Sequence, residues 1–248
     1  MRDTRVTDGL KALQLVGMAA EYERQEMALV AQDLPYPERI MQMIHAEIDW
    51  KADRRSARLL KASGLNPAVI PERLHYGIER GMDRSLIAEL CTCQFIRLAQ
   101  NVTIVGATGN GKTFLGSALG RCAIRQGIAV RYYRAHRLVE DFAVARLDGS
   151  IRRLRAALRK VPLLILDEFG LFDISDQGKE ELLDVLEDRA GTGSTIVIGQ
   201  LSVKEWHDFI GTPLLADAIL DRILCRSYNI ELTGESMRVR NPNAAPEA

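Results

Sequence analysis

The chain has 248 residues, and its 33 Lys and Arg side chains balance its 33 Asp and Glu side chains. This length allows one large hydrophobic core with a smaller appended domain. A formal net charge of zero excludes a polycation that coats nucleic acid, so any such contact must come from local basic patches. Because no apolar run is long enough to cross a bilayer and no signal peptide is recognisable, we expect a soluble cytoplasmic protein without membrane partners.

The N-terminal part, up to about residue 98, shows helical periodicity without an alternating strand pattern. Pro35 and Pro37 separate a first apolar stripe from a second helix, which Gly64 ends. Basic residues at spacings of three and four share one broad face of this second helix and match a phosphate backbone. An ordinary solvated face is the alternative, since acids and bases balance over the first 95 residues. These residues are Lys51, Arg54, Arg55, Arg58 and Lys61.

A glycine-rich stretch follows an apolar run at residues 102–105 and precedes a helical pattern. It fits G-x-x-x-x-G-K-[ST], in which glycines let backbone N–H groups surround the phosphates of a nucleotide. Lys112 would contact the terminal phosphates, and the Thr113 hydroxyl would bind the accompanying Mg²⁺. The sequence therefore predicts a nucleotide-binding loop formed by Gly106, Ala107, Thr108, Gly109, Asn110, Gly111, Lys112, Thr113 and Phe114.

The next elements are a strand at residues 129–133 and helices at 135–147 and 151–160. Lys and Arg far outnumber acids between residues 121 and 160, which is the steepest charge asymmetry in the chain. We interpret this region as a nucleic-acid surface; the alternative is a helix whose arginines pair with acids of a neighbouring subunit. The candidate contacts are Arg134, Arg137, Arg152 and Arg153.

Four aliphatic residues at 163–166 lead into the acidic pair Asp167 and Glu168. This pattern is typical of a buried parallel strand with functional residues at its carboxyl end. Asp167 would hold Mg²⁺, and Glu168 would orient the water that attacks the γ-phosphate. The acidic pair therefore predicts nucleotide hydrolysis, although an Asp-Glu turn cap is the simpler alternative.

A helix at about 177–190, a strand at 194–200, helices at 203–209 and 213–225 and a strand at 227–232 complete the pattern. The alternation predicts an α/β fold with a five-stranded parallel sheet flanked by helices. Gln200 ends the fourth strand, where a polar sensor for the γ-phosphate is expected. An arginine supplied by a neighbouring subunit would complete such a site, and spacing leaves Arg189, Arg222 and Arg238 open.

The motifs at residues 106–113, 164–170, 205–211, 215–222 and 230–238 together resemble the IstB family, AAA+ ATPases that assist insertion-sequence transposases. The resemblance covers nearly the whole chain. It implies ATP and Mg²⁺ at Lys112, Thr113 and Asp167, with Glu168 catalytic and Gln200 as sensor. It further implies that Arg222 is the finger supplied in trans and Arg238 a second sensor. Gly199 departs from the Ser or Thr that many relatives have before the sensor.

The resemblance further implies ATP-dependent assembly into a homo-oligomer on double-stranded DNA, DNA deformation and recruitment of a cognate transposase. Phosphate contacts predict little sequence specificity. We expect a helical DNA-binding and assembly domain at residues 1–75, the AAA+ ATPase domain at 76–240 and a disordered tail at 241–248. The four cysteines, at 91, 93, 122 and 225, fit neither a zinc site nor a disulfide framework, so we expect core thiols.

Three other functions compete with a transposition helper. A helicase loader like DnaC would use the same hydrolysis but would carry a helicase-docking module in its N-terminal region. A small-molecule kinase would need an acceptor pocket and lid arginines, for which we see no motif. A DNA-binding architectural protein with negligible turnover would not need Glu168.

Overall fold

The computed structural model describes residues 4–27, 34–76, 81–234 and 236. The chain divides into two compact units, Met1–Arg58 and Leu59–Ala248. The expected tail at 241–248 and Arg238 lie outside the described residues. Among the helices that are described, none is long and apolar enough to span a membrane.

The first unit is helical, as predicted, and contains α1 (Arg5–Ala12), α2 (Val16–Met27) and most of α3 (Tyr36–Ser63). Gly17 lets α2 approach α3 closely, because a Cβ there would stand 2.4 Å from the Ala46 carbonyl oxygen. The buried Glu47 carboxylate accepts hydrogen bonds from the Gly17 and Met18 N–H groups at 2.7 and 3.1 Å. These N–H groups open α2 and have no intrahelical acceptor, so Glu47 acts as an N-terminal cap supplied by α3.

The second unit begins with the last residues of α3, whose Leu59 and Leu60 pack against its core. A 3₁₀ turn (Pro71–Arg73), α4 (Arg84–Cys91) and α5 (Gln94–Arg97) follow. Leu65, Val69 and Leu74 are buried in the same apolar cluster as the first strand of the sheet. The functional boundary that we place at residues 75 and 76 remains a prediction, since residues on both sides of it pack in this unit.

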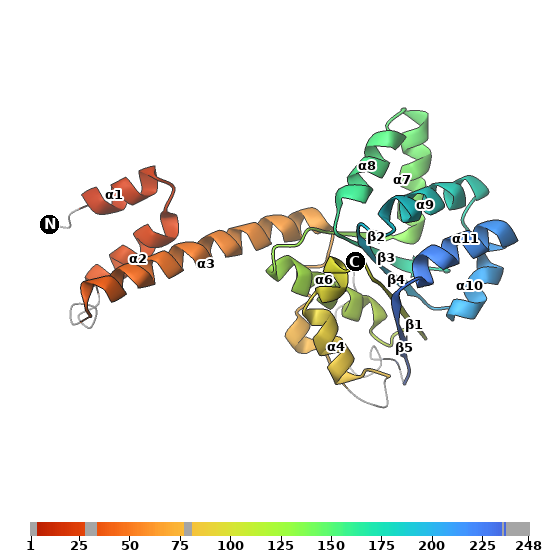
Figure 1. The fold of residues 1–248 in the computed structure, drawn as a ribbon, viewed down its shortest axis with the longest axis horizontal. Coiled ribbons are helices and arrows are strands. Elements are labelled where there is room, and N and C mark those ends of the chain that lie inside the picture. The colour runs from red at the N-terminus through yellow and green to blue at the C-terminus, as the bar shows by residue number, and fades with distance from the viewer. Residues whose placement is uncertain (1–3, 28–33, 77–80, 235, 237–248) are drawn as a thin grey trace. The chain divides into compact units, whose positions relative to one another are not determined.

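The second unit contains a five-stranded parallel sheet, which confirms the predicted fold class (Figure 1). Its strands pair in the order β2-β3-β4-β1-β5, and every pair is parallel. The expected sensor strand, β4, lies between the strand of the glycine loop, β1, and the strand of the acidic pair, β3. The bounds are β1 Asn101–Gly106, β2 Val130–Arg134, β3 Leu163–Phe169, β4 Ser194–Gly199 and β5 Ser227–Leu232.

Helices cover both faces of the sheet, because alternate strand residues point to opposite sides and both sides are apolar. On one face Ile104, Ile165 and Ile198 pack in the cluster that includes α4 and α6 (Lys112–Arg125). On the other face Leu166 and Val197 pack with the remaining helices (Figure 1). These are α7 Ala135–Leu147, α8 Ile151–Lys160, α9 Asp176–Arg189, α10 Val203–Ile210 and α11 Pro213–Leu224.

The cysteines only partly follow expectation. Cys93 is fully buried in the core, where burial raises its pKa to about 11, and Cys91 and Cys122 pack partly buried against the same cluster. Cys225 is exposed, so the expectation of a core thiol is wrong there. This residue directly follows α11 and precedes the edge strand β5, where no further layer covers it in the described structure.

Arg189 ends α9 and is 1% exposed. Its guanidinium donates to the carbonyl oxygens of Leu158 and Val161 at 2.6 and 2.7 Å and also to that of Ser194. A further bond reaches the Thr195 hydroxyl at 3.2 Å. Burial lowers the pKa of Arg189 to about 10, which leaves it charged at neutral pH. Arg189 therefore ties the ends of α8 and α9 to the start of β4.

We predict that Arg189→Met lowers the free energy of unfolding by about 3 kcal/mol or more, because three backbone carbonyls lose their charged donor in a buried place. The measurement is urea unfolding of the full chain. The matched control is Arg159→Met on the exposed side of α8, which should change stability by about 0.5 kcal/mol at most. Equal stability of the two variants would contradict the structural role of Arg189.

Candidate active site

The glycine loop connects β1 directly to α6 at the carboxyl edge of the sheet. Gly106, Gly109 and Gly111 have φ angles of 145°, 86° and 87°, a region that side chains other than glycine rarely enter. At Gly106 an added Cβ would lie 2.2 Å from the Leu232 carbonyl oxygen, whereas at Gly111 it would have no atom of the described residues within 4 Å. The backbone of β5 thus borders the loop at Gly106, and the described residues leave space in front of the first turn of α6.

Two polar contacts join the glycine loop to itself and to the sensor strand. The buried Lys112 ammonium donates to the Ala107 carbonyl oxygen at 2.8 Å, so its charge lies across the loop. The Thr108 hydroxyl donates to Gln200 Oε1 at 2.9 Å, although 92 residues separate them in the chain. The structure therefore brings Gln200 to the loop, next to the place expected for a γ-phosphate.

Asp167 is 3% exposed. It forms the last residue pair between β3 and β2, opposite Arg134. Its carboxylate accepts hydrogen bonds from the Tyr132 hydroxyl and from the Glu168 N–H, both at 2.8 Å. Burial first, and then the Asp167 carboxylate, raise the pKa of Tyr132 well above its usual range, so the phenol stays a donor. Sequence analysis missed Tyr132, although its strand neighbours β3.

Glu168 has a left-handed backbone with φ of 60°, at a register irregularity between β3 and β4. Such a conformation costs on the order of 1 kcal/mol outside glycine and redirects a side chain from its strand face. The carboxylate lies 3.6 Å from Arg134 Nε and 3.5 Å from His136 Nδ1. The His136 ring contacts Phe172 with ring centroids 4.7 Å apart. Arg134, a predicted DNA contact, thus lies beside the Glu168 carboxylate.

Packing explains the glycine that precedes the sensor. A Cβ on Gly199 would lie 2.7 Å from the Phe169 carbonyl oxygen and 3.1 Å from the buried Trp206 indole. The Trp206 ring also packs edge-on against Phe169, with centroids 5.1 Å apart. Trp206 occupies the space that a serine or threonine side chain would need, so the departure from the family pattern at Gly199 follows from this aromatic contact.

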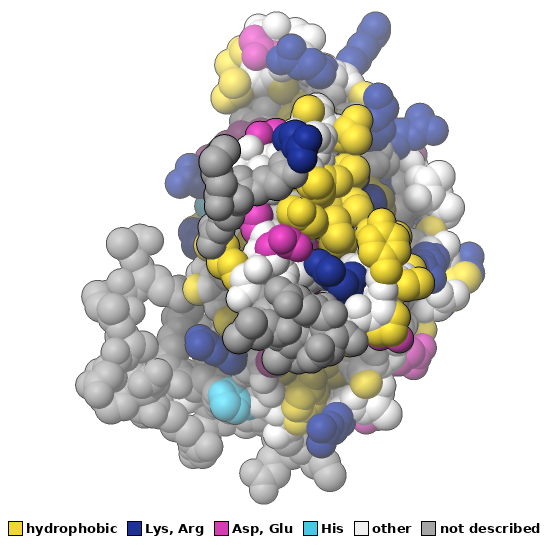
Figure 2. Space-filling view, turned by 90° about the vertical axis from the view of Figure 1, so that its left-hand side faces the viewer, with side chains coloured by type: hydrophobic (Ala, Val, Ile, Leu, Met, Phe, Trp, Pro, Cys, Tyr) yellow, Lys and Arg dark blue, Asp and Glu magenta, His cyan; other side chains and the backbone are white. Residues whose placement is uncertain are grey.

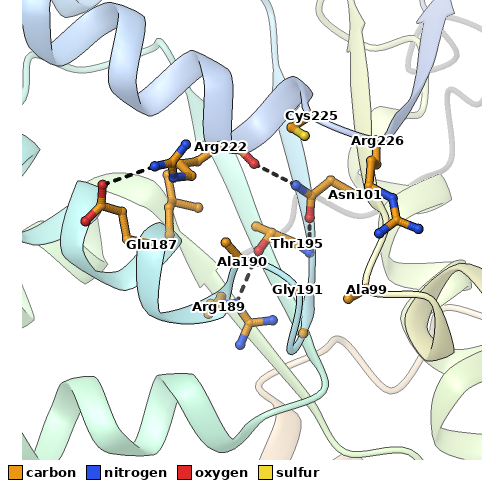
Figure 3. A pocket seen from close by; sticks show the side chains of 12 residues that line it. Ala99, Asn101, Glu187, Arg189, Ala190, Gly191, Thr195, Arg222, Cys225 and Arg226 are labelled. Atoms are coloured by element: carbon orange, nitrogen blue, oxygen red, sulfur yellow. Dashed lines mark hydrogen bonds and ion pairs between the residues drawn. The ribbon is translucent and has the colours of Figure 1, made fainter.

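Arg222 is far from this edge. Asn101, the first residue of β1, donates from its side-chain amide to the Arg222 carbonyl oxygen, which places Arg222 at the amino edge of the sheet. Its guanidinium is partly exposed and pairs with Asp221 at 2.6 Å. It also pairs with Glu187 at 3.5 Å (Figure 3). A pocket of about 360 Å³ at this edge is lined by Arg222, Arg226 and ten other residues. Because Arg189 is buried and bonded to carbonyls, it is not a candidate finger.

The predicted DNA contacts lie on two surfaces of the described chain. On α3, Lys51 pairs with Glu47 at 3.1 Å and Arg54 stacks over the Trp50 ring at 4.8 Å. The exposed side chains of this set are Lys51, Arg54, Arg55, Arg58 and Lys61, and those near α7 and α8 are Arg134, Arg137, Arg152 and Arg153. Figure 2 shows Lys and Arg dispersed among apolar and acidic side chains on the face drawn.

The residues of the carboxyl edge fit a nucleotide and Mg²⁺. No atom of the described residues lies within 4 Å of a Cβ added at Gly111, at the start of α6, and the amino end of a helix attracts phosphate through its N–H groups and its dipole. The exposed Thr113 hydroxyl and the Asp167 carboxylate supply the oxygen ligands that Mg²⁺ prefers. Within the described residues no group of three His, Cys, Asp or Glu side chains could hold a metal ion.

Relatives match along almost the full length of the chain. A protein of Sinorhizobium fredii named as an insertion sequence ATP-binding protein, y4pL, is 39% identical over 231 residues, which are 93% of this chain and 94% of the relative. The corresponding IS5376 protein of Geobacillus stearothermophilus is 28% identical over 98% of this chain and 97% of its own length.

Solved structures support the fold. The DnaC helicase loader superimposes with a TM-score of 0.58 at 19% identity, over 66% of this chain and 97% of its own. AMPPCP-bound DnaA from Aquifex aeolicus superimposes with a TM-score of 0.60 at 19% identity, over 72% of this chain and 54% of its own. Residues 8–245 match the family model described as IstB-like ATP binding protein. The chain is therefore an ATPase of the AAA+ class and belongs to the IstB-like ATP-binding protein family.

Proposed function

We propose that this chain is an ATP-driven helper of insertion-sequence transposition, which assembles on duplex DNA and stimulates a transposase. One observation supports the proposal above the others. The groups for ATP hydrolysis lie at the carboxyl edge of the sheet, whereas Arg222 lies at the amino edge. A subunit that carries one half of an active site at each of two opposite edges is suited to head-to-tail assembly with identical subunits.

The separation of the two edges prevents Arg222 from serving its own site. Asn101 and Gly106 are the two ends of β1, so about 17 Å of extended strand separates them at about 3.3 Å per residue. An arginine side chain bound to the backbone beside Asn101 cannot contact a phosphate beyond Gly106. Arg222 therefore acts in trans, where it neutralises charge that develops on the γ-phosphate of the adjacent subunit.

Within one subunit the roles follow from the contacts. Backbone N–H groups of the loop and Lys112 bind the phosphates, while Gln200 lies within reach of the γ-phosphate through the Thr108 side of the loop. Thr113 and Asp167 would hold Mg²⁺, which would neutralise phosphate charge. Glu168 orients the attacking water and accepts its proton. The Tyr132 hydroxyl fixes the Asp167 carboxylate beside it.

The DNA and transposase partners rest on the family. The relatives are named as ATP-binding proteins of insertion sequences, which ties them to a transposable element. Non-specific contacts by many subunits add up along a duplex and supply the several kcal/mol that bending it requires. A helicase loader remains the alternative, but the likeness to DnaC is one of fold.

We predict that Glu168→Gln does not hydrolyse ATP and that Arg222→Ala lowers the rate of hydrolysis by a factor of about 10³. A mixture of the two variants should recover activity. In the mixture, an intact site on an Arg222→Ala subunit receives the intact Arg222 of a Glu168→Gln subunit. Phosphate release against mixing ratio measures this. Arg226→Ala, at the same edge, is the matched control for a lost positive charge. A mixture without activity would contradict the trans role of Arg222.

We also predict that removal of predicted phosphate contacts weakens duplex binding equally for all sequences. Each lost contact should lower the slope of log affinity against log salt by about 1. Duplex binding is measured by fluorescence anisotropy in the presence of ATP. One double variant combines Arg152→Ala with Arg153→Ala on α8, and another combines Arg58→Ala with Lys61→Ala on α3. The control pair, Arg97→Ala with Lys204→Ala, removes two exposed charges elsewhere. Equal weakening by the control would show a general charge effect instead of defined surfaces.

A further inference from the structure

The end of α11 is fixed to the amino edge of the sheet by one side chain. Asn101 Nδ2 donates to the carbonyl oxygens of Arg222 and Ile223 at 2.9 and 3.1 Å. Its Oδ1 accepts a hydrogen bond from the Thr195 N–H at 2.9 Å (Figure 3). The amide group of Asn101 thus links the backbone of α11 to β4, while its own backbone begins β1.

These bonds fall where α11 needs them. The last carbonyl groups of a helix have no intrahelical donor, and α11 ends at Leu224. Asn101 supplies donors to two of these orphan carbonyls, one of which belongs to the residue that carries the proposed finger. Arg222 is partly exposed, and its side chain is paired only with acids at the surface, Glu187 and Asp221, in the contacts given above. Its place is therefore determined mainly by its backbone.

We infer that Asn101 is the positioning residue for Arg222, so that it controls catalysis in the adjacent subunit and not in its own. The inference rests on the proposed trans role of Arg222. A guanidinium must meet a phosphate at hydrogen-bond distance, and a displacement near 1 Å of a catalytic group lowers rates by about 100-fold. Surface ion pairs are too weak to hold an exposed arginine to that accuracy.

The competing interpretation is that Asn101 supports its own subunit's active site. β1 leads from Asn101 into the glycine loop, and β4, which Asn101 also bonds, leads into Gln200. Loss of activity in an Asn101 variant alone cannot separate the two interpretations. Mixed oligomers can separate them. They show whether a variant subunit fails to supply the arginine to its neighbour or fails to hydrolyse ATP in its own nucleotide site.

Two substitutions isolate the bonds to α11. Asn101→Asp keeps the acceptor for the Thr195 N–H but replaces the donor by an oxygen that repels the Arg222 and Ile223 carbonyls. Asn101→Leu has a similar shape without charge, and it separates the loss of position from the effect of a new carboxylate near Arg222. Asn66→Asp is the control for an added charge, since Asn66 is exposed and accepts one bond from the Ala68 N–H.

We expect Asn101→Asp and Asn101→Leu to hydrolyse ATP about 10-fold to 100-fold more slowly than the unchanged protein, with ATP affinity unaltered. Mixing either with Glu168→Gln should restore hydrolysis, because the Glu168→Gln subunits supply a well-placed Arg222. Mixing either with Arg222→Ala should restore nothing. Asn66→Asp should behave as the unchanged protein. The measurements are phosphate release in mixtures and binding of a fluorescent ATP analogue.

The reverse pattern, with recovery alongside Arg222→Ala but not alongside Glu168→Gln, would overturn the inference and assign Asn101 to its own site. Full activity of both Asn101 variants alone would also overturn it. The reference mixture of Glu168→Gln with Arg222→Ala distinguishes the two levels of the account. If that mixture recovers and the Asn101 mixtures do not follow, the inference fails while the trans finger stands; if it does not recover, both fail.

Discussion

The parallel direction of all five strands is the constraint on which the rest depends. It places the ends of β1, β3 and β4 at one edge, so the glycine loop, the acidic pair and Gln200 meet there although they are far apart in the chain. It also sends the beginnings of the same strands to the opposite edge, where Arg222 lies. One topological property thus completes the phosphate site and separates it from its arginine, and assembly of subunits resolves that separation.

The two edges are built by different means. At the carboxyl edge, left-handed backbone at the glycines and at Glu168 exposes N–H groups and a carboxylate to ligands. At the amino edge, Asn101 and Arg189 donate hydrogen bonds to carbonyl groups at the ends of α11 and α8. The carboxyl edge thus presents backbone donors and a carboxylate, whereas side-chain hydrogen bonds fix the backbone at the amino edge.

The sequence predicts the fold and the local motifs well, because glycine spacing, strand runs and the acidic pair act through neighbours in the chain. The structure adds the strand order, with β4 between β1 and β3. Tyr132, His136 and Asn101 were missed because their contacts join elements that are separated in the chain, which no local spacing encodes. Arg189 could be excluded as a finger only once its burial was known. Likewise, the glycine at position 199 could be explained only from its contact with Trp206.

Sedimentation of the full chain with a random-sequence duplex of tens of base pairs tests the central claim of ATP-held assembly on DNA most directly. Three states are compared, namely with ATP and Mg²⁺, with ADP, and without nucleotide. The account predicts large complexes only where ATP and duplex are both present. A small particle whose sedimentation is indifferent to duplex and to ATP would contradict it and would favour a different client or substrate for the same hydrolysis.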